Sequence, residues 1–203
     1  MRTTARKSAP EVTGGKVQKK NNWALTPNYY SHRQRELVID RKRPGKSYRH
    51  VLTRRDIQDF IDILPDWEEL SRGLDAIVLA PGEDNVAGYH VPGVVHVCAW
   101  DEEMWMDYKR DTDFFRNHEP IFVRLGVPIE YSDDGYALCK FDESTARAYQ
   151  LLHILLHELG HHHDRITSKK KRNTGRGEPY AEAYALAYEA RIWDDYRRRF
   201  DLY

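Results

Sequence analysis

The residues best suited to chemistry are two histidines and a glutamate in the second half of the chain. His157 and His161 stand four positions apart in the run His-Glu-Leu-Gly-His, and Glu158 follows the first of them. Residues four apart lie on one face of a helix, so both imidazoles can point at one metal ion. Glu158 is offset by one position and can take a proton from water beside that ion. The pattern predicts a zinc site with Glu158 as general base.

A catalytic zinc ion usually has three protein ligands and one open position. A third histidine of the metzincin type would need a glycine at 164 and a histidine at 167, but the chain has Asp164 and Thr167. The remaining candidates are three later acids, Glu178, Glu182 and Glu189. We expect Glu182, because it lies one turn inside the final helix. Glu178 is expected to cap that helix and Glu189 to lie beyond reach.

Two motifs together resemble a known group of enzymes. HELGHHHD at 157–164, followed by PYAEAYALAYE at 179–189, is similar to the gluzincin metallopeptidases, above all the anthrax lethal factor catalytic domain and the Pro-Pro endopeptidases. The resemblance covers roughly residues 145–195. It implies a zinc metalloendopeptidase with His157, His161 and Glu182 as ligands and Glu158 as base. The run HELGH also resembles the ImmA/IrrE group, which would imply cleavage of a single regulator.

The donor that would stabilise the transition state is not fixed by the sequence. In the resembling enzymes a tyrosine precedes the third ligand by about two turns, where this chain has Gly175. An oxyanion needs a hydroxyl or imidazole donor, so Tyr180, Tyr184 and His162 are the candidates. Packing in an aromatic-rich helix is the alternative for both tyrosines. His162, His163 and Asp164 extend the motif, and they either orient the ligands or lie in solvent at a helix end.

Hydrophobic periodicity predicts the elements that hold these residues. A helix follows Thr53 as its N-cap, and strands are expected at 74–79, 86–91 and 94–100. A helix at 102–117 and a hairpin of 129–131 with 136–141 come next. A long helix runs from about 144 to 164, and the last begins at 179. We expect an α+β, zincin-like fold: a small mixed sheet with an inserted helix, then the active-site helix and a C-terminal ligand helix.

Two further expectations concern how this fold would serve the site. Gly160 has no side chain, which would let another element approach the active-site helix closely. The strand at 136–141 would present an edge to which an extended peptide substrate pairs.

The chain has 203 residues and no net charge, but its charge is unevenly distributed. Residues 1–55 hold fifteen Lys and Arg against three acids. We expect a disordered basic tail at 1–22 and one metallopeptidase-like domain at 23–203. The basic region would contact nucleic acid, a membrane surface or the acidic remainder of the chain, or be a solvated tail. An alternative function is therefore nucleic-acid association with a structural or vestigial zinc site.

Cysteine content and hydropathy bear on the compartment. Cys98 and Cys139 each lie in an apolar stretch without metal-site spacing, which predicts buried thiols in a reducing compartment. No apolar run reaches the roughly 18 residues of a membrane helix, and none near the start is typical of a secretory signal. These features predict a cytoplasmic protein without a membrane span.

Overall fold

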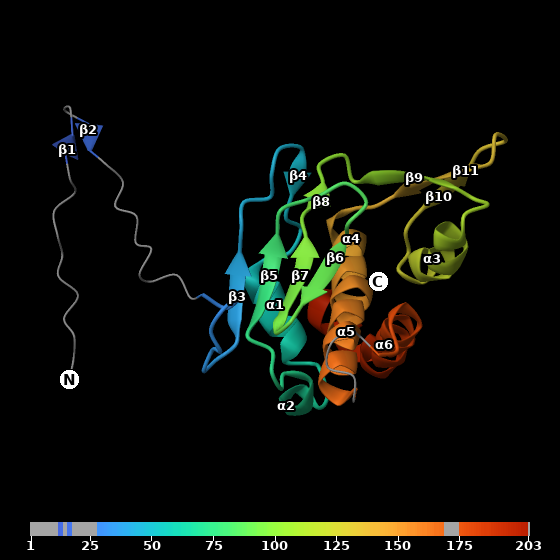
Figure 1. Cartoon of the computed structure of the whole chain (residues 1–203). Coiled ribbons are helices and arrows are strands. Elements are labelled where there is room, and N and C mark those ends of the chain that lie inside the picture. Colours follow the sequence, from blue (N-terminus) through green and yellow to red (C-terminus); the bar gives the residue numbers. More distant parts are fainter. Residues whose placement is uncertain (1–11, 14–15, 18–27, 169–174, 203) are drawn as a thin grey trace, which may run out of the picture.

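The computed structural model describes residues 12–13, 16–17, 28–168 and 175–202. The elements in chain order (Figure 1) are β1 Val12–Thr13, β2 Lys16–Val17, β3 Val38–Arg41, β4 Tyr48–Arg49, α1 Arg54–Ile61, α2 Trp67–Leu70, β5 Ala76–Ala80, β6 Gly88–Val91, β7 Val94–Cys98, β8 Trp100–Asp101, β9 Trp105–Lys109, α3 Asp113–Arg124, β10 Ile129–Tyr131, β11 Tyr136–Lys140, α4 Glu143–Tyr149, η2 Gln150–Leu155, α5 Leu156–Thr167 and α6 Glu178–Phe200. The mixed α+β class is as expected. Apart from β1 and β2, the predicted tail at 1–22 lies outside the described residues.

A four-stranded sheet in the order β3-β5-β7-β6 forms the centre of the domain. Strands β3, β5 and β7 are parallel, and β6 pairs antiparallel with β7 at one edge. β5 and β7 are buried along their whole length, as expected for parallel strands covered on both faces. The strands expected at 74–79, 86–91 and 94–100 are thus present with slightly shifted ends.

Alternate residues of the sheet belong to two different cores. Ile77, Leu79, Val95 and Val97 face the helices and join the main core. Ala76, Val78, Val94 and Cys98 face the other side, where Tyr29 packs on them. This alternation follows from the two-residue period of a strand. In Figure 1, α1, α5 and α6 lie on the side of the sheet where the main core is.

The helix that carries the His-Glu-Leu-Gly-His run is longer and less regular than the sequence predicts. α4, η2 and α5 follow one another without a break from Glu143 to Thr167. The middle portion, Gln150–Leu155, is a π-helix, and all six of its residues are buried. π-Helical turns are rare and often occur at functional sites. Here the π-helix immediately precedes the His-Glu-Leu-Gly-His run.

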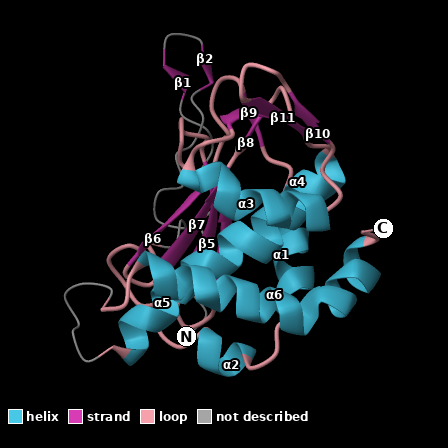
Figure 2. Ribbon diagram, turned by 90° about the vertical axis from the view of Figure 1, so that its right-hand side faces the viewer, coloured by secondary structure: helices cyan, strands magenta, loops and turns pink. Residues whose placement is uncertain are grey.

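α6 lies alongside α5 (Figure 2), and the two helices are in close contact at Gly160. A Cβ atom built on Gly160 would lie 2.9 Å from Cα of Ala181 and 3.1 Å from its carbonyl oxygen. No ordinary side chain fits at that distance, so the expectation that Gly160 permits a close neighbour is confirmed. The packing brings the start of α6 beside the middle of α5.

A second sheet, in the order β10-β11-β9, carries α3. The hairpin of β10 and β11 is as expected, but the helix predicted at 102–117 is wrong in its first part. β9 occupies Trp105–Lys109, with exposure alternating at every residue, and α3 begins only at Asp113. The acidic and aromatic composition suggested a helix, whereas the two-residue period of burial is that of a strand.

The expectation of a free edge at 136–141 is also wrong. β11 pairs with β10 on one side and with β9 on the other, so both of its edges are occupied. In the four-stranded sheet, β6 is the edge strand beside α5.

The capping of α1 and the state of the cysteines agree with the sequence. The Thr53 hydroxyl accepts from the backbone N–H of Asp56, and the Asp56 carboxylate accepts from that of Thr53. Cys98 and Cys139 are buried and free. No helix in the described part of the chain is long and apolar enough to cross a membrane.

Candidate metal centre

Three side chains from α5 and α6 converge on one point. The Nε2 atoms of His157 and His161 are 3.1 Å apart. Glu178 places Oε2 at 3.0 Å from Nε2 of His157 and Oε1 at 3.2 Å from Nε2 of His161. Ligand atoms arranged tetrahedrally at about 2 Å from zinc lie roughly 3.3 Å from one another. The three side chains therefore have the spacing of a mononuclear metal site.

Glu182, the expected third ligand, occupies a different position. Its Oε2 lies 3.3 Å from Nδ1 of His157, on the opposite side of that ring from Glu178. A carboxylate accepts, so Nδ1 of His157 can donate to Glu182, and with that proton on Nδ1 the lone pair of Nε2 would be available to a metal. Metal-binding histidines usually donate their other N–H to such a group. In this structure the Glu178 carboxylate contacts the Nε2 atoms of both His157 and His161, whereas the Glu182 carboxylate contacts Nδ1 of His157.

Glu178 differs from its expected role because of where α6 begins. Gly177 is the N-cap, with φ +67°, and Glu178 is the first helical residue, followed by a proline. The carboxylate therefore belongs to the first turn and points back towards α5. Its side chain is 78% exposed, whereas those of His157 and His161 are largely buried. The cluster is thus open to solvent on the side of Glu178.

Glu158 lies on the sheet side of α5, next to the edge strand β6. A Cβ atom built on Gly88 would lie 3.1 Å from Cγ of Glu158, so the strand and the carboxylate stem are in contact. Glu158 is only 7% exposed. Burial raises the pKa of its carboxyl to about 7, with His157 acting in the opposite direction. A carboxyl with a pKa near neutrality suits proton transfer in both directions.

Asp164 fixes the segment that leads into α6. Its buried carboxylate accepts from the backbone N–H groups of Arg176 and Gly177, at 2.9 and 3.1 Å. It also accepts from Nε of Arg176 at 2.7 Å. These bonds join the end of α5 to the start of α6, directly before Glu178. Of the two alternatives for Asp164, the solvated position at a helix end is therefore wrong.

The two candidate tyrosines contact His163. The Tyr180 hydroxyl lies 2.7 Å from Nδ1 of His163. The guanidinium of Arg176 stacks over the ring of Tyr180. Tyr184 stacks on the same imidazole, and its hydroxyl is buried without a partner among the described residues. Neither ring has a hydrogen bond or ring contact with His157 or His161 in the described part of the chain. These contacts make both tyrosines part of the α5–α6 packing.

His162 and Glu189 lie in other surroundings. His162 is buried on the sheet side, and its Nε2 donates to the carbonyl of Arg72 at 2.9 Å. Glu189 forms a two-point ion pair with Arg124 of α3, at 2.7 and 2.6 Å. As expected, Glu189 is not part of the group formed by His157, His161 and Glu178.

Several basic residues of the N-terminal region pair with acids of the chain itself. Arg33 contacts Asp75, and the other pairs are Lys42 with Asp40, Arg49 with Glu143, Arg54 with Asp40 and Arg55 with Asp59. Asp75, Glu143 and Asp59 belong to the acidic remainder of the chain, whereas Asp40 belongs to the basic region itself. The basic run at 169–172 lies outside the described residues.

Searches with protein-family models, among curated proteins and among solved structures find no match for this chain.

Proposed function

We propose that the chain is a zinc-dependent metallopeptidase with a zincin-like fold, its metal held by His157, His161 and Glu178. The observation that carries the proposal is the convergence of both Nε2 atoms and the Glu178 carboxylate at metal-ligand spacing. Two imidazoles and one carboxylate are a ligand set of catalytic zinc. Three lone-pair groups held so close would repel one another without a cation or proton between them, which also supports a metal.

Zinc bound there would polarise a substrate carbonyl and lower the pKa of water. Glu158 would take the proton from the attacking water and deliver it to the leaving amine. Its burial between α5 and β6 keeps the carboxylate away from bulk solvent. Glu182 would hold His157 in the tautomer that leaves Nε2 free.

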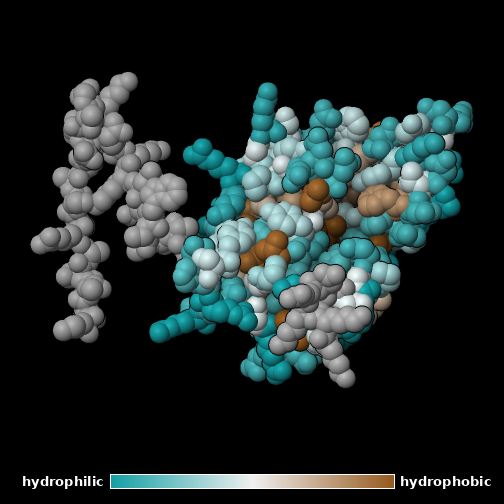
Figure 3. All heavy atoms as spheres, in the orientation of Figure 1, coloured by the Kyte–Doolittle hydropathy of each residue, from teal (hydrophilic) through white to brown (hydrophobic). Residues whose placement is uncertain are grey.

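The substrate class follows from the edge strand. β6 pairs with β7 on one side, and no strand in the described part of the chain pairs with its other side. An extended peptide can add to such an edge through main-chain hydrogen bonds. In Figure 3 hydrophobic residues gather near the middle of the face that Figure 1 presents, within a hydrophilic surround. We therefore propose an extended peptide, bound along β6, as the substrate.

The first test is metal content, measured by plasma mass spectrometry on tag-free protein purified without chelators. We expect about one tightly bound zinc per chain, strongly reduced in His161→Gln. A protein that holds no metal after zinc is supplied contradicts the proposal.

The general base is tested separately with Glu158→Gln and a library of fluorogenic peptides. We expect the variant to retain zinc and to lose hydrolysis by at least about 100-fold, because general-base catalysis contributes on that order. Hydrolysis at the wild-type rate would remove Glu158 from the mechanism. Cleavage of no peptide by zinc-loaded wild type would direct attention to a single specific protein substrate.

A further inference from the structure

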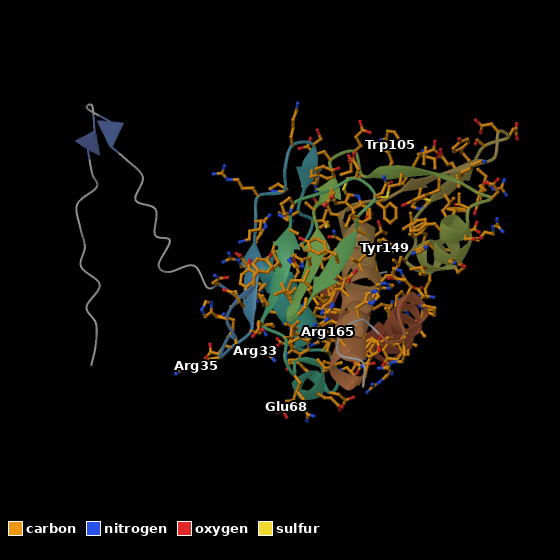
Figure 4. The ribbon with its side chains drawn as sticks, in the orientation of Figure 1. Arg33, Arg35, Glu68, Trp105, Tyr149 and Arg165 are labelled. Carbon is orange, nitrogen blue, oxygen red and sulfur yellow. The ribbon has the colours of Figure 1, made fainter. Side chains whose placement is uncertain are left out.

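An arginine lies on the face of α5 that carries the two histidines, one turn beyond them. Arg165 follows His161 by four positions, as His161 follows His157, so the three side chains leave the helix on one face. Figure 4 labels Arg165 on the lower half of α5. Burial lowers the pKa of His90 in β6 to about 3, and the positive charge of nearby Arg165 contributes in the same direction. Arg165 is therefore close to the edge strand as well as to the histidines.

The strand β6 and the helix α5 run alongside each other in matching steps. A Cβ atom built on Gly88 would lie 3.1 Å from Cγ of Glu158. Two residues further along β6, the ring centroid of His90 lies 5.5 Å from that of His162. Two residues of a strand rise about 6.6 Å and four residues of a helix about 6 Å, so the two elements advance together. A peptide that pairs with β6 therefore passes from the level of Glu158 to that of Arg165.

Arg165 differs from the other half-buried arginines of the described residues because it has no acidic partner. Arg49 pairs with Glu143. Arg147 lies 3.9 Å from Asp56. Arg165 is half-buried too, but it has no hydrogen bond or ion pair with any described residue. A guanidinium that loses part of its hydration without gaining a carboxylate costs stability, so its position favours a partner from outside the chain.

From this geometry we infer that Arg165 binds a carboxylate of the peptide substrate, about three residues from the bond that is hydrolysed. The inference rests on the proposed function, since it takes the peptide to lie along β6. Glu158 and Arg165 are about 10 Å apart along the helix axis, a rise that an extended chain covers in about three residues. A guanidinium binds a carboxylate through two parallel hydrogen bonds. In a peptide that carboxylate belongs either to an Asp or Glu side chain or to the C-terminus.

The test uses zinc-loaded full-length protein and two sets of fluorogenic peptides. In the first set Glu replaces Gln at one position at a time on either side of the cleaved bond, and in the second set the C-terminus is free or amidated. We expect kcat/KM of wild type to be at least about tenfold higher with a carboxylate at one place, the scale of a hydrogen-bonded charge pair. Preference in the first set assigns the carboxylate to a side chain, and preference in the second assigns it to the chain end. Arg165→Gln loses the preference, and Arg165→Glu disfavours the carboxylate.

Arg43→Gln is the matched control, because Arg43 is an exposed arginine just beyond β3, at the opposite edge of the sheet from β6. It removes the same charge and keeps the preference of wild type. A preference that falls equally in Arg43→Gln and Arg165→Gln reflects overall charge and overturns the carboxylate site. Equal rates of wild type on all peptide pairs, or a preference retained in Arg165→Gln, overturn it as well.

Failure of the proposed function gives a different result. If wild type hydrolyses no peptide, the binding of the same peptides, carrying a fluorescent label, is measured by anisotropy with wild type and Arg165→Gln. Tighter binding of carboxylate peptides that is lost in Arg165→Gln keeps the carboxylate site and counts against hydrolysis alone. Equal binding of all the peptides, or binding of none, overturns the carboxylate site whatever the zinc content.

Discussion

At the scale of single residues, the sequence predicted the two histidines and favoured Glu182 over Glu178 as third ligand, whereas in the structure Glu178 contacts both Nε2 atoms. Glu178 and Glu182 are four positions apart and lie on the same face of α6, so helical spacing fits both. The choice depends on where α6 begins and how it crosses α5. Both features belong to the tertiary structure: Gly177 at the N-cap determines where α6 begins, and the contact at Gly160 determines how α6 packs on α5.

The roles of the two glutamates can be separated by replacing each with glutamine. Glu178→Gln removes a carboxylate that contacts both Nε2 atoms, so we expect its zinc affinity to fall more than that of Glu182→Gln. Loss of an orienting partner typically costs about 10–100-fold in metal affinity. Competition with a chromogenic chelator measures both values. Equal affinity of Glu178→Gln and wild type would return the role of third ligand to Glu182.

At the scale of elements, periodicity predicted α1, the hairpin and the two long helices. It missed the π-helix, because the apolar run QLLHIL is equally compatible with an α-helix. It also missed β3, whose residues Val38–Arg41 combine apolar and charged side chains within a basic region. In each case the deciding contacts are with other elements: η2 with α5, α6 and β7, and β3 with β5. Local sequence carries no record of such contacts.

Gly160→Ala tests the crossing of α5 and α6. In an open helix this change would stabilise the protein by about 1 kcal/mol. Here the new methyl group would lie 2.9 Å from Cα of Ala181, which is backbone and cannot move aside alone. We expect a loss of about 1–3 kcal/mol in the free energy of unfolding. Urea denaturation measures it, and a gain in stability would mean that the helices are farther apart than described.

The hydrogen bonds of Asp164 make a similar prediction for the start of α6. Asp164→Asn replaces an acceptor of three N–H groups by an amide that accepts at only one of its atoms, so Glu178 loses its fixed position. We expect lower stability and a zinc affinity reduced by about tenfold or more. Glu189→Gln is the matched control, since it disrupts the ion pair of a buried carboxylate with Arg124, further along α6 from Glu178.

Glu189→Gln should lose stability while keeping its zinc affinity, measured by the same chelator competition. Equal reductions of zinc affinity in the two variants would show that Asp164 acts through general stability rather than through Glu178.

At the scale of the whole molecule, the second face of the sheet is covered by the described segment that begins at residue 28. Tyr29 is buried there and its hydroxyl donates to Asp40 of β3 at 2.7 Å, while Lys42 pairs with the same carboxylate at the same distance. Figure 4 shows Arg33 and Arg35 at the β3 side of the sheet, away from α5. The basic region thus contributes to the fold through its pairing with the chain's own acids. The sequence showed only its charge.

This covering segment makes stability depend on pH. Burial alone would raise the pKa of Asp40, but hydrogen bonds from Lys42, Tyr29 and the backbone of Arg41 outweigh it and hold the pKa below its ordinary value. A carboxyl whose pKa is lower in the folded state stabilises the protein above its unfolded pKa of about 3.9. That contribution is lost as the pH falls through the folded value.

Asp40→Asn should therefore unfold about 1–2 kcal/mol more easily than wild type at pH 7, the scale of hydrogen bonds to a charged group. The difference in unfolding free energy should shrink towards zero as both proteins are taken below about pH 3. There the Asp40 carboxyl of wild type becomes protonated and is uncharged, like the asparagine of the variant. Chemical denaturation across that range measures it. Asp133→Asn, in an exposed turn, is the control and should match wild type at both ends. A difference that persists unchanged in acid would mean that Asp40 supports the fold through packing, without its charge.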